Sequence, residues 1–278
     1  RLISFNKNTG FSHACNAAIR ASESPYVALL NNDTEVSPQW LTALVEAINN
    51  DETTGMAASK ILLNKTTIDS TGMFIYPDGI GRQRGRGEID VGQYDDKTEI
   101  LYPSGCACLI RHKMLDDTGL LDEDFFAYCE DVDLGLRGRA AGWGAVYAPN
   151  AVVYHKYSGT GGKYSLFKAF LVERNRIWVA VKNFPLRFIL KAPFYTFKRY
   201  LYQAYSIITS RGSTAKFAQG VSVSAMAMIF LKAYGAAILK IPSMLTKRFF
   251  IKKRIATAEF SRLLKKHEVS VSELILKD

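Results

Sequence analysis

Tyr26-Val27-Ala28-Leu29-Leu30 is a continuous apolar run that leads directly into the polar residues Asn31-Asn32-Asp33-Thr34. A run of this kind is typical of a strand buried on both faces of a sheet. Helical spacing over 11–21 precedes it and 2–5 reads as an earlier strand, so the segment predicts a βαβ unit. Open α/β sheets bind ligands at the carboxyl ends of strands, which makes Asp33 a candidate site residue.

Further elements of an α/β fold follow along the chain. An apolar stripe over 40–48 predicts a helix that starts near Ser37-Pro38. Strands are expected over 55–63, 106–110 and 146–155, and helices within 122–139 and 164–183. The Gly- and charge-rich segment 64–100 contains arginines interleaved with glycines that could hold phosphate, but a solvated mobile loop is the favoured interpretation.

The charge of the chain is divided unevenly. The 278 residues carry a formal net charge of +10, yet residues 1–185 hold 19 Lys/Arg against 22 Asp/Glu and residues 186–278 hold 17 against 4. The composition, 48% hydrophobic and 22% charged, excludes a disordered chain. The basic last third points to an anionic partner, and lipid headgroups and nucleic acid both satisfy that description.

The four cysteines favour a reducing compartment, because they are few and spread out. Cys106 and Cys108 have no second pair at the spacing of a zinc site, so they are expected to be core residues of a strand.

The region beyond Pro185 mixes aromatic, apolar and cationic residues, a composition typical of helices that lie at a membrane interface. The most apolar stretch, 221–241, approaches the length of a bilayer span but contains Lys232. We expect it to lie on the membrane or pack within the protein rather than to span. The basic run 247–254 suits an anionic leaflet, and a solvated helix face is the alternative.

Three groups of residues could carry chemistry. Asp33 could hold a divalent ion with a substrate diphosphate, or could simply cap the next helix. Glu130, Asp131 and Asp133 follow a run of aromatic residues, where burial raises the pKa of a carboxyl and prepares it as a general base. Asp133 can pair with Arg137 at i+4, which leaves Glu130 and Asp131 as the freer acids; an acid-rich helix start is the alternative.

His155 is the third candidate, because it closes a strand and precedes the Gly-rich loop 158–162. A neutral imidazole can join an aspartate on a divalent ion, and the loop amides could reach a phosphate. A lone histidine is more often structural.

These motifs, taken in order, resemble family 2 glycosyltransferases, particularly the bacterial rhamnosyltransferase-like branch. The resemblance covers residues 1–185 and rests on Asn8-Thr9-Gly10-Phe11, Leu30-Asn31-Asn32-Asp33-Thr34-Glu35-Val36, Gly105-Cys106-Ala107-Cys108-Leu109-Ile110-Arg111, the segment 125–134, Gly142-Trp143, His155 and Arg174-Asn175. It implies a GT-A fold, a Rossmann-like mixed sheet with flanking helices, and an inverting displacement on a nucleotide-diphospho-sugar.

The resemblance also implies roles for residues. Asp33 looks like the metal-binding acid of the DxD-type motif, whose first acid is replaced here by Asn31, and His155 looks like a further contact to the metal or diphosphate. Asp131 looks like the catalytic base, with Glu130 beside it. The donor nucleotide would lie against Asn8, Gly10, Asn32 and Asp33. Trp143 and the turn Ser104-Gly105-Cys106 resemble parts that line the acceptor side.

In this family a first strand, with an acid that reads the nucleotide base, lies upstream of the turn at which this chain begins. We therefore expect that an N-terminal piece is missing from residues 1–185, the catalytic domain. Residues 186–278 would form a second, helical region for membrane association or oligomerisation.

The leading hypothesis is a metal-dependent glycosyltransferase that uses Mn²⁺ or Mg²⁺ and a nucleotide-sugar. It would build cell-surface polysaccharide on a saccharide or lipid-linked acceptor at the inner face of the cell membrane, without nucleic acid. A nucleotidyl- or phospho-sugar enzyme on a similar fold and a non-catalytic membrane-binding module are the alternatives. Rhamnose from a thymidine donor is the branch's commonest association, whereas the sequence names neither the sugar nor the acceptor.

Overall fold

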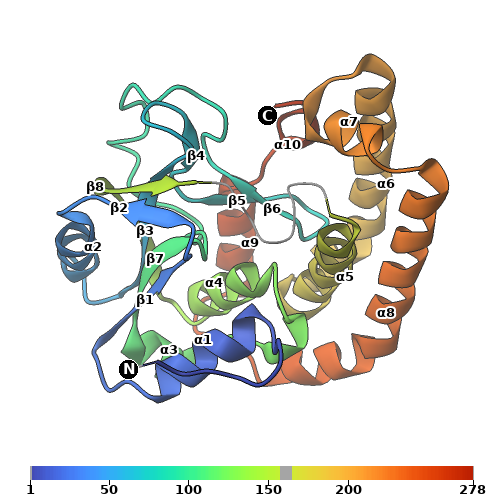
Figure 1. The fold of residues 1–278 in the computed structure, drawn as a ribbon. Helices are drawn as coiled ribbons and strands as arrows, with labels where there is room; N and C mark the ends of the chain where they lie inside the picture. The colour runs from blue at the N-terminus through green and yellow to red at the C-terminus, as the bar shows by residue number, and fades with distance from the viewer. Residues whose placement is uncertain (1, 157–164, 278) are drawn as a thin grey trace.

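A six-stranded mixed sheet forms the centre of the protein, in a computed structural model that describes residues 2–156 and 165–277 (Figure 1). The strand order is β1-β7-β3-β8-β2, and β4 pairs with the end of β3. The strands are β1 (Tyr26–Leu30), β2 (Thr34–Val36), β3 (Thr54–Leu62), β4 (Ile68–Ser70), β7 (Ala107–Arg111) and β8 (Gly144–His155). Strands β3 and β8 run parallel, and the other pairs are antiparallel. The predicted α/β class with a mixed sheet is confirmed.

Helices cover both faces of this sheet. They are α1 (Phe11–Arg20), α2 (Trp40–Asn49), α3 (His112–Thr118), α4 (Glu130–Ala140) and α5 (Leu166–Asn183), with a 3₁₀ turn, η1 (Glu123–Phe125), before α4. Alternate residues of β3 face opposite ways, as a pleated strand requires. Ala57 and Ile61 pack on the α2 stripe Trp40, Leu44 and Ile48. Met56 and Ala58 belong to the larger core that α4 and α5 complete. Strand β3 is therefore buried along its whole length.

Two expectations for the N-terminal segment are wrong. Strand β1 is an edge strand that pairs with β7, and Leu30 at its end is 44% exposed, so the run is not buried on both faces. Residues 2–5 form no strand in the structure; their side chains are exposed, and no described strand pairs with them. Because no strand pairs with residues 2–5, their backbone N–H and C=O groups form hydrogen bonds with water instead of with a sheet.

The segment 64–100 is not the solvated loop that its composition predicts. It contains β4 and a hairpin of β5 (Met73–Ile75) and β6 (Gly81–Gln83), and much of it is buried. The guanidinium of Arg84 donates to both the hydroxyl and the carbonyl of Thr71 and lies over the rings of Tyr94 and Tyr147. Composition alone cannot reveal this burial, because the partners that satisfy the charge come from elsewhere in the fold.

The last third of the chain is helical, and much of it lies on the right of Figure 1. It comprises α6 (Leu186–Thr209), α7 (Gly212–Gln219), α8 (Val223–Phe249), α9 (Thr257–Lys266) and α10 (Val271–Leu276). Helix α8 packs along α5, and Met244 of α8 and Phe260 of α9 belong to the main core. The division at residue 185 stays a prediction, but the two parts share one core.

Buried ion pairs reinforce this contact. Asp78, in the turn between β5 and β6, pairs with Arg176 of α5 and Arg199 of α6, while Glu173 of α5 binds the same two arginines. All four side chains are buried, and each charge has an opposite partner, the condition under which such groups are tolerated in a core.

Candidate active site

Several chain segments end at the same edge of the sheet. Leu30 of β1 lies opposite Ala107 of β7, and the Asn31 amide donates to the Cys106 carbonyl at 2.8 Å. On the other side, Thr34 of β2 lies opposite His155 at the end of β8. The sheet topology therefore brings the turn that contains Asp33 next to His155, although the two are far apart in sequence.

His155 lies between two carboxylates. Its Nδ1 is 2.9 Å from Oδ2 of Asp69, and its Nε2 is 3.4 Å from Oδ1 of Asp33. The hydrogen bond to Asp69 and the charges of both aspartates raise the pKa of His155, against the lowering effect of burial. Among the described residues, Asp33 Oδ1 is a buried atom with no hydrogen-bond partner. A proton or a metal ion between Nε2 and Oδ1 would give this oxygen a partner.

These residues fit a divalent cation. Mg²⁺ commonly takes one or two protein ligands and substrate phosphates, and two cis ligands at about 2.1 Å from an octahedral ion lie about 3 Å apart. The 3.4 Å between Nε2 of His155 and Oδ1 of Asp33 is close to that separation. The described residues hold no cluster of three or more His, Cys, Asp or Glu suited to a metal, so the protein itself supplies few ligands.

Glu130 and Asp131 begin α4 on the other side of Cys106. Glu130 is 6% exposed, its Oε2 has no hydrogen-bond partner among the described residues, and burial together with the charge of Asp131 raises its pKa to about 8. Burial also raises the pKa of Asp131, while hydrogen bonds from the amides of Gly105 and Val132 oppose that shift. Two adjacent carboxyls with raised pKa values can share one proton at neutral pH.

Cys106 connects the two acidic groups. Burial raises the pKa of its thiol first, and the charges of Asp69, Asp33 and Asp131 raise it further. All three carboxylates are therefore within electrostatic reach of one side chain. The turn that precedes β7 is held by Ser104, whose Oγ accepts from the Cys106 amide at 3.3 Å. The turn Ser104-Gly105-Cys106 thus lies between two acidic groups. One is Asp33, which faces His155, and the other is the pair of Glu130 and Asp131 on α4.

A strained loop leads into α4. Phe126, Tyr128 and Cys129 all have positive φ, at 65°, 67° and 67°. Non-glycine residues adopt this region rarely, and it concentrates at functional sites. Asn175 of α5 holds the loop, because its Nδ2 lies within 3.0 Å of the carbonyls of Phe125, Ala127 and Tyr128.

The turn at Asn8 and Gly10 supports the same loop. Asn8 accepts from the Gly10 amide at 3.0 Å, and Gly10 has φ 87°. A Cβ at Gly10 would lie 2.5 Å from the Phe126 carbonyl oxygen, so only glycine fits this contact. Asn8 and Asn32 are exposed. Their role toward a nucleotide stays a prediction.

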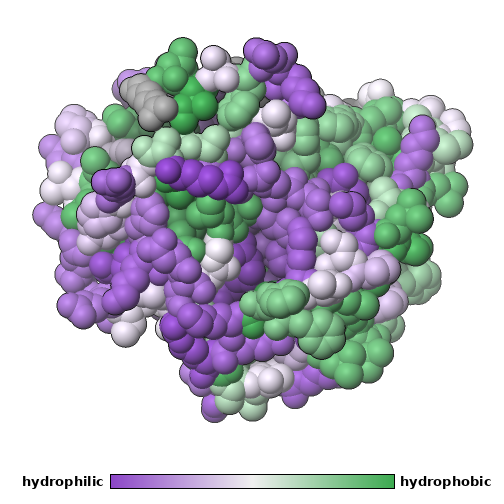
Figure 2. Space-filling view, turned by 90° about the horizontal axis from the view of Figure 1, so that it is seen from below, coloured by the Kyte–Doolittle hydropathy of each residue, from purple (hydrophilic) through white to green (hydrophobic). Residues whose placement is uncertain are grey.

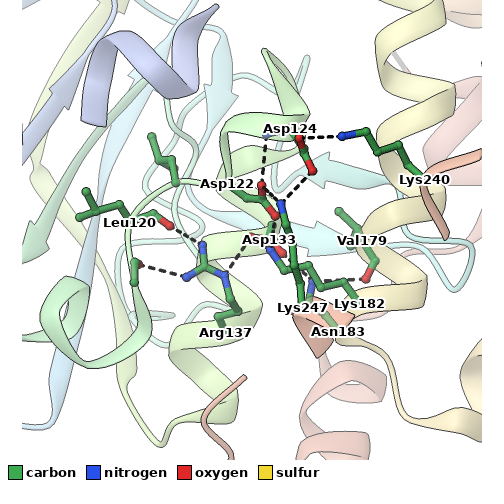
Figure 3. A network of polar contacts seen from close by, with 12 residues as sticks. Leu120, Asp122, Asp124, Asp133, Arg137, Val179, Lys182, Asn183, Lys240 and Lys247 are labelled. Carbon is green, nitrogen blue, oxygen red and sulfur yellow. Dashed lines mark hydrogen bonds and ion pairs between the residues drawn. The ribbon is translucent and has the colours of Figure 1, made fainter. Parts of the chain in front are cut away.

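Asp133 is separated from the other acids by its partners (Figure 3). It is fully buried, pairs with Arg137 and Lys182 at 2.9 Å, and accepts from Asn183. Lys182 and Arg137 hold its pKa well below the ordinary value despite burial. The predicted i, i+4 pair is confirmed, and Asp133 is a structural anion.

Trp143 is buried immediately before β8, where its Nε1 donates to Asp117 at 2.9 Å. His155 is the last residue of the same strand, so Trp143 and His155 lie at opposite ends of β8. The role of Trp143 on the acceptor side, which the resemblance implies, stays a prediction.

Sequence reasoning missed Asp69 and the contacts of Asn175. Asp69 is separated from His155 by 86 positions, and it lies in a segment expected to be solvated. Asn175 was part of a recognised motif, but its three carbonyl partners are 47 to 50 positions away. No periodicity or spacing reports such contacts.

Comparison with known proteins identifies the family. The sequence model described as "Glycosyltransferase like family 2" matches residues 1–180. An N-acetylglucosaminyl-diphospho-decaprenol L-rhamnosyltransferase of Mycobacterium tuberculosis is 34% identical over 126 residues, which are 42% of this chain and 40% of that protein. An uncharacterized protein, y4gI, of Sinorhizobium fredii is 31% identical over 162 residues, 55% of this chain and 17% of that protein. The chain thus covers less than half the length of either relative.

Among solved structures, GalNAc-T7 with UDP, GalNAc and Mn²⁺ superposes with a TM-score of 0.51 at 14% identity, over 86% of this chain and 45% of that one. At this identity the likeness concerns the fold, which is that of GT-A enzymes. With the family match over 1–180, the chain belongs to the family described as glycosyltransferase like family 2, and its fold is the GT-A fold.

Proposed function

We propose that the protein transfers a sugar, with inversion at the anomeric carbon, from a nucleotide-diphospho-sugar to a saccharide or lipid-linked saccharide. The observation that supports this most is the position of Asp131, across Cys106 from the pair of Asp33 and His155. An inverting displacement needs a base for the acceptor hydroxyl and, opposite it, a group that stabilises the departing diphosphate.

Asp131 is the base in this proposal. The residue is half-buried, its carboxyl is desolvated enough that burial raises its pKa, and the Gly105 amide holds Oδ2 in place. Burial and the charge of Asp131 raise the pKa of Glu130, which favours the protonated form of that side chain. We assign the negative charge of the pair to Asp131, the member that accepts the proton of the acceptor.

Asp33 and His155 face the donor diphosphate and would hold Mn²⁺ or Mg²⁺. A bound divalent ion stabilises the negative charge that develops on a departing nucleoside diphosphate. The donor turn, Asn8 and Gly10, contacts the loop before Asp131, so the donor and acceptor sides are mechanically joined through Phe126.

The mycobacterial relative, by its name, acts on a diphospho-decaprenol carrying N-acetylglucosamine and transfers L-rhamnose. For this protein we propose an acceptor of the same chemical class, a saccharide on a lipid diphosphate, in the synthesis of a cell-surface polysaccharide. A rhamnosyl donor is the first to test.

The test is a transfer assay with purified protein, a panel of nucleotide-sugars and a short-chain lipid diphosphate saccharide, with Mn²⁺ or with EDTA. We expect transfer from one donor, loss of turnover in EDTA and in Asp33→Ala, and a product whose anomeric configuration, read by NMR, is opposite to that of the donor. Retained configuration would refute inversion. Release of sugar phosphate without any transfer would instead indicate a phospho-sugar enzyme.

The surface of α6 and α8 supports a location at a membrane. Exposed apolar side chains recur every three or four residues along one side of α6, at Leu186, Leu190, Phe194, Phe197, Leu201, Tyr205 and Ile208. A similar stripe on α8 includes Met228, Leu231, Ile238, Leu245 and Phe249. Figure 2 shows hydrophobic residues gathered on the right, the side on which α8 lies, whereas much of the rest is hydrophilic.

The charge near these stripes favours a lipid surface over a second copy of the chain. The sequence has no Asp or Glu from Arg174 to Ala258, although it has Lys and Arg throughout. Two such faces would repel each other, whereas anionic headgroups attract them. We propose that the protein binds the inner face of the cell membrane through this surface.

Helix α8 is better suited to lie on the membrane than to cross it. Among the described residues, 224–249 is the one segment long and apolar enough to span, by length and composition alone. However, Lys240 and Lys247 of α8 pair with Asp124, and Ala237 is fully buried against the rest of the protein. A spanning α8 would break these contacts.

Sedimentation with vesicles tests the membrane proposal. We expect binding to phosphatidylglycerol vesicles that weakens with salt, no binding to duplex DNA, and a loss of at least tenfold in Leu190→Ser/Phe197→Ser. Leu41→Ser is the matched control, since Leu41 of α2 is similarly exposed outside the stripes. Equal binding by the double variant and the wild type would exclude this surface.

A further inference from the structure

Asp69 is a buried acid that none of the roles above uses. It lies in β4, is 4% exposed, and reaches the sheet edge because β4 pairs with the end of β3. Its Oδ2 accepts from Nδ1 of His155 at 2.9 Å, and its Oδ1 is bonded to the guanidinium of Arg86. Both carboxylate oxygens are therefore engaged, each by a different cationic or polar group.

This arrangement bears on which nitrogen of His155 carries the hydrogen. A neutral imidazole has one N–H donor and one acceptor nitrogen. If Nδ1 carries the hydrogen and donates it to Asp69, then Nε2 is the unprotonated nitrogen, and Nε2 is the atom that faces Asp33 at 3.4 Å. Arg86 binds the other oxygen of Asp69, so the carboxylate is held in place from both sides.

We propose that Asp69 is a positioning residue, held by Arg86, that fixes His155 in the tautomer and orientation needed to bind a divalent cation together with Asp33. The proposal rests on the metal-dependent function proposed above. Such outer carboxylates typically change metal affinity 10–100-fold. The proposal also gives a function to β4, which carries Asp69, and to the arginine-rich segment after it, which carries Arg86. Both elements support the donor side of the site.

The first experiment reads the tautomer without any metal. The chain has four histidines, so ¹⁵N-histidine labelling gives a simple long-range ¹H–¹⁵N spectrum, in which His155→Gln identifies the His155 signals. At pH 9 we expect the Nδ1–H tautomer in the wild type and the Nε2–H tautomer in Asp69→Ala. Asp69→Asn, which keeps an acceptor oxygen, should restore Nδ1–H. An Nε2–H tautomer in the wild type would overturn the proposal.

The second experiment measures Mn²⁺ affinity by electron paramagnetic resonance, with the metal alone. We expect the dissociation constant to rise about 10–100-fold in Asp69→Ala, and less in Asp69→Asn and Arg86→Gln. Asp95→Ala is the control, since Asp95 lies in the same segment but pairs with Lys60.

The outcomes separate this inference from the proposed function. Unchanged Mn²⁺ affinity in Asp69→Ala, with affinity lost in Asp33→Ala, would overturn the role of Asp69 and leave the metal-dependent transferase intact. No Mn²⁺ binding by the wild type would overturn both the metal dependence and this role. If Asp69→Ala does not fold, the Mn²⁺ affinity of Asp69→Asn and Arg86→Gln decides, and unchanged affinity in both variants would refute the proposal.

Discussion

The backbone amide of Gly105 donates a 3.0 Å hydrogen bond to Oδ2 of Asp131. Oδ1 of the same carboxylate accepts from the Val132 amide at 2.8 Å. The start of β7 and the first turn of α4 thus fix the carboxylate by main-chain contacts. A Cβ at Gly105 would lie 3.3 Å from the Asp131 Cβ, so the turn approaches the acid as closely as a residue without a side chain permits.

Asp131→Asn should nearly abolish turnover while leaving the fold intact. The amide oxygen can still accept from Gly105, but it cannot take a proton from the acceptor. A placed general base contributes on the order of 10²–10⁴-fold, and kcat should fall by that factor. Initial rates measure the effect. Asp124→Asn, which alters a carboxylate paired with surface lysines, should keep near-normal turnover. A value of kcat in Asp131→Asn within threefold of the wild type would exclude Asp131 as the base.

Asp133→Ala should show the opposite pattern, a loss of stability. The substitution leaves Lys182 and Arg137 buried without their shared anion (Figure 3). Breaking a buried pair in this way lowers the free energy of unfolding by about 3–5 kcal/mol. Urea unfolding checks this, with Asp131→Asn as the comparison. Similar midpoints for Asp133→Ala and the wild type would contradict the structural assignment.

Asn175→Ala should reduce both stability and kcat. Its amide donates to three carbonyls of the loop before α4, and a buried carbonyl left unsatisfied lowers the stability by about 1–3 kcal/mol. Because the loop positions Glu130 and Asp131, we expect kcat to fall more than KM changes. Asn64→Ala, which removes turn contacts to Thr66 and Thr67, is the control. A stability loss without any change in kcat would mean that Asn175 supports the fold alone.

Glu130→Gln should change how stability depends on pH. The folded protein raises the pKa of Glu130 from 4.5 to about 8, so between these values it retains a proton that the unfolded chain releases. Wild-type stability therefore falls as the pH rises through this window, by up to about 1.4 kcal/mol per unit from this group. Denaturant unfolding from pH 5 to 8 should show a shallower decline in Glu130→Gln. Parallel curves would indicate that Glu130 is ionised in the folded state.

The sequence predicted the elements that local patterns control. The apolar stripe of Trp40, Leu44 and Ile48 predicted helix α2. The ion pair of Asp133 and Arg137 was predictable because the two residues are four positions apart on α4. The proximity of Asp33 and His155 came only from the family resemblance, since the pairing of β2 with β8 is not visible in either segment.

Failures of prediction share a physical cause. Arg84 looked solvated because its partners Tyr94 and Tyr147 approach only after folding. The apolar run 26–30 predicted a strand that is buried on both faces. It is an edge strand instead, because apolar composition does not distinguish an edge strand from a central one.

The loop of Phe126, Tyr128 and Cys129 bears on how the protein responds to heat. Each left-handed residue stores about 1–3 kcal/mol of strain, which the contacts from Asn175 and Gly10 offset. A segment held in this way opens at a lower free energy than the buried sheet beneath it. Warming should therefore release the loop, and misplace Asp131, at temperatures where circular dichroism still reports intact helices. Inactivation would precede melting, and it would reverse on cooling.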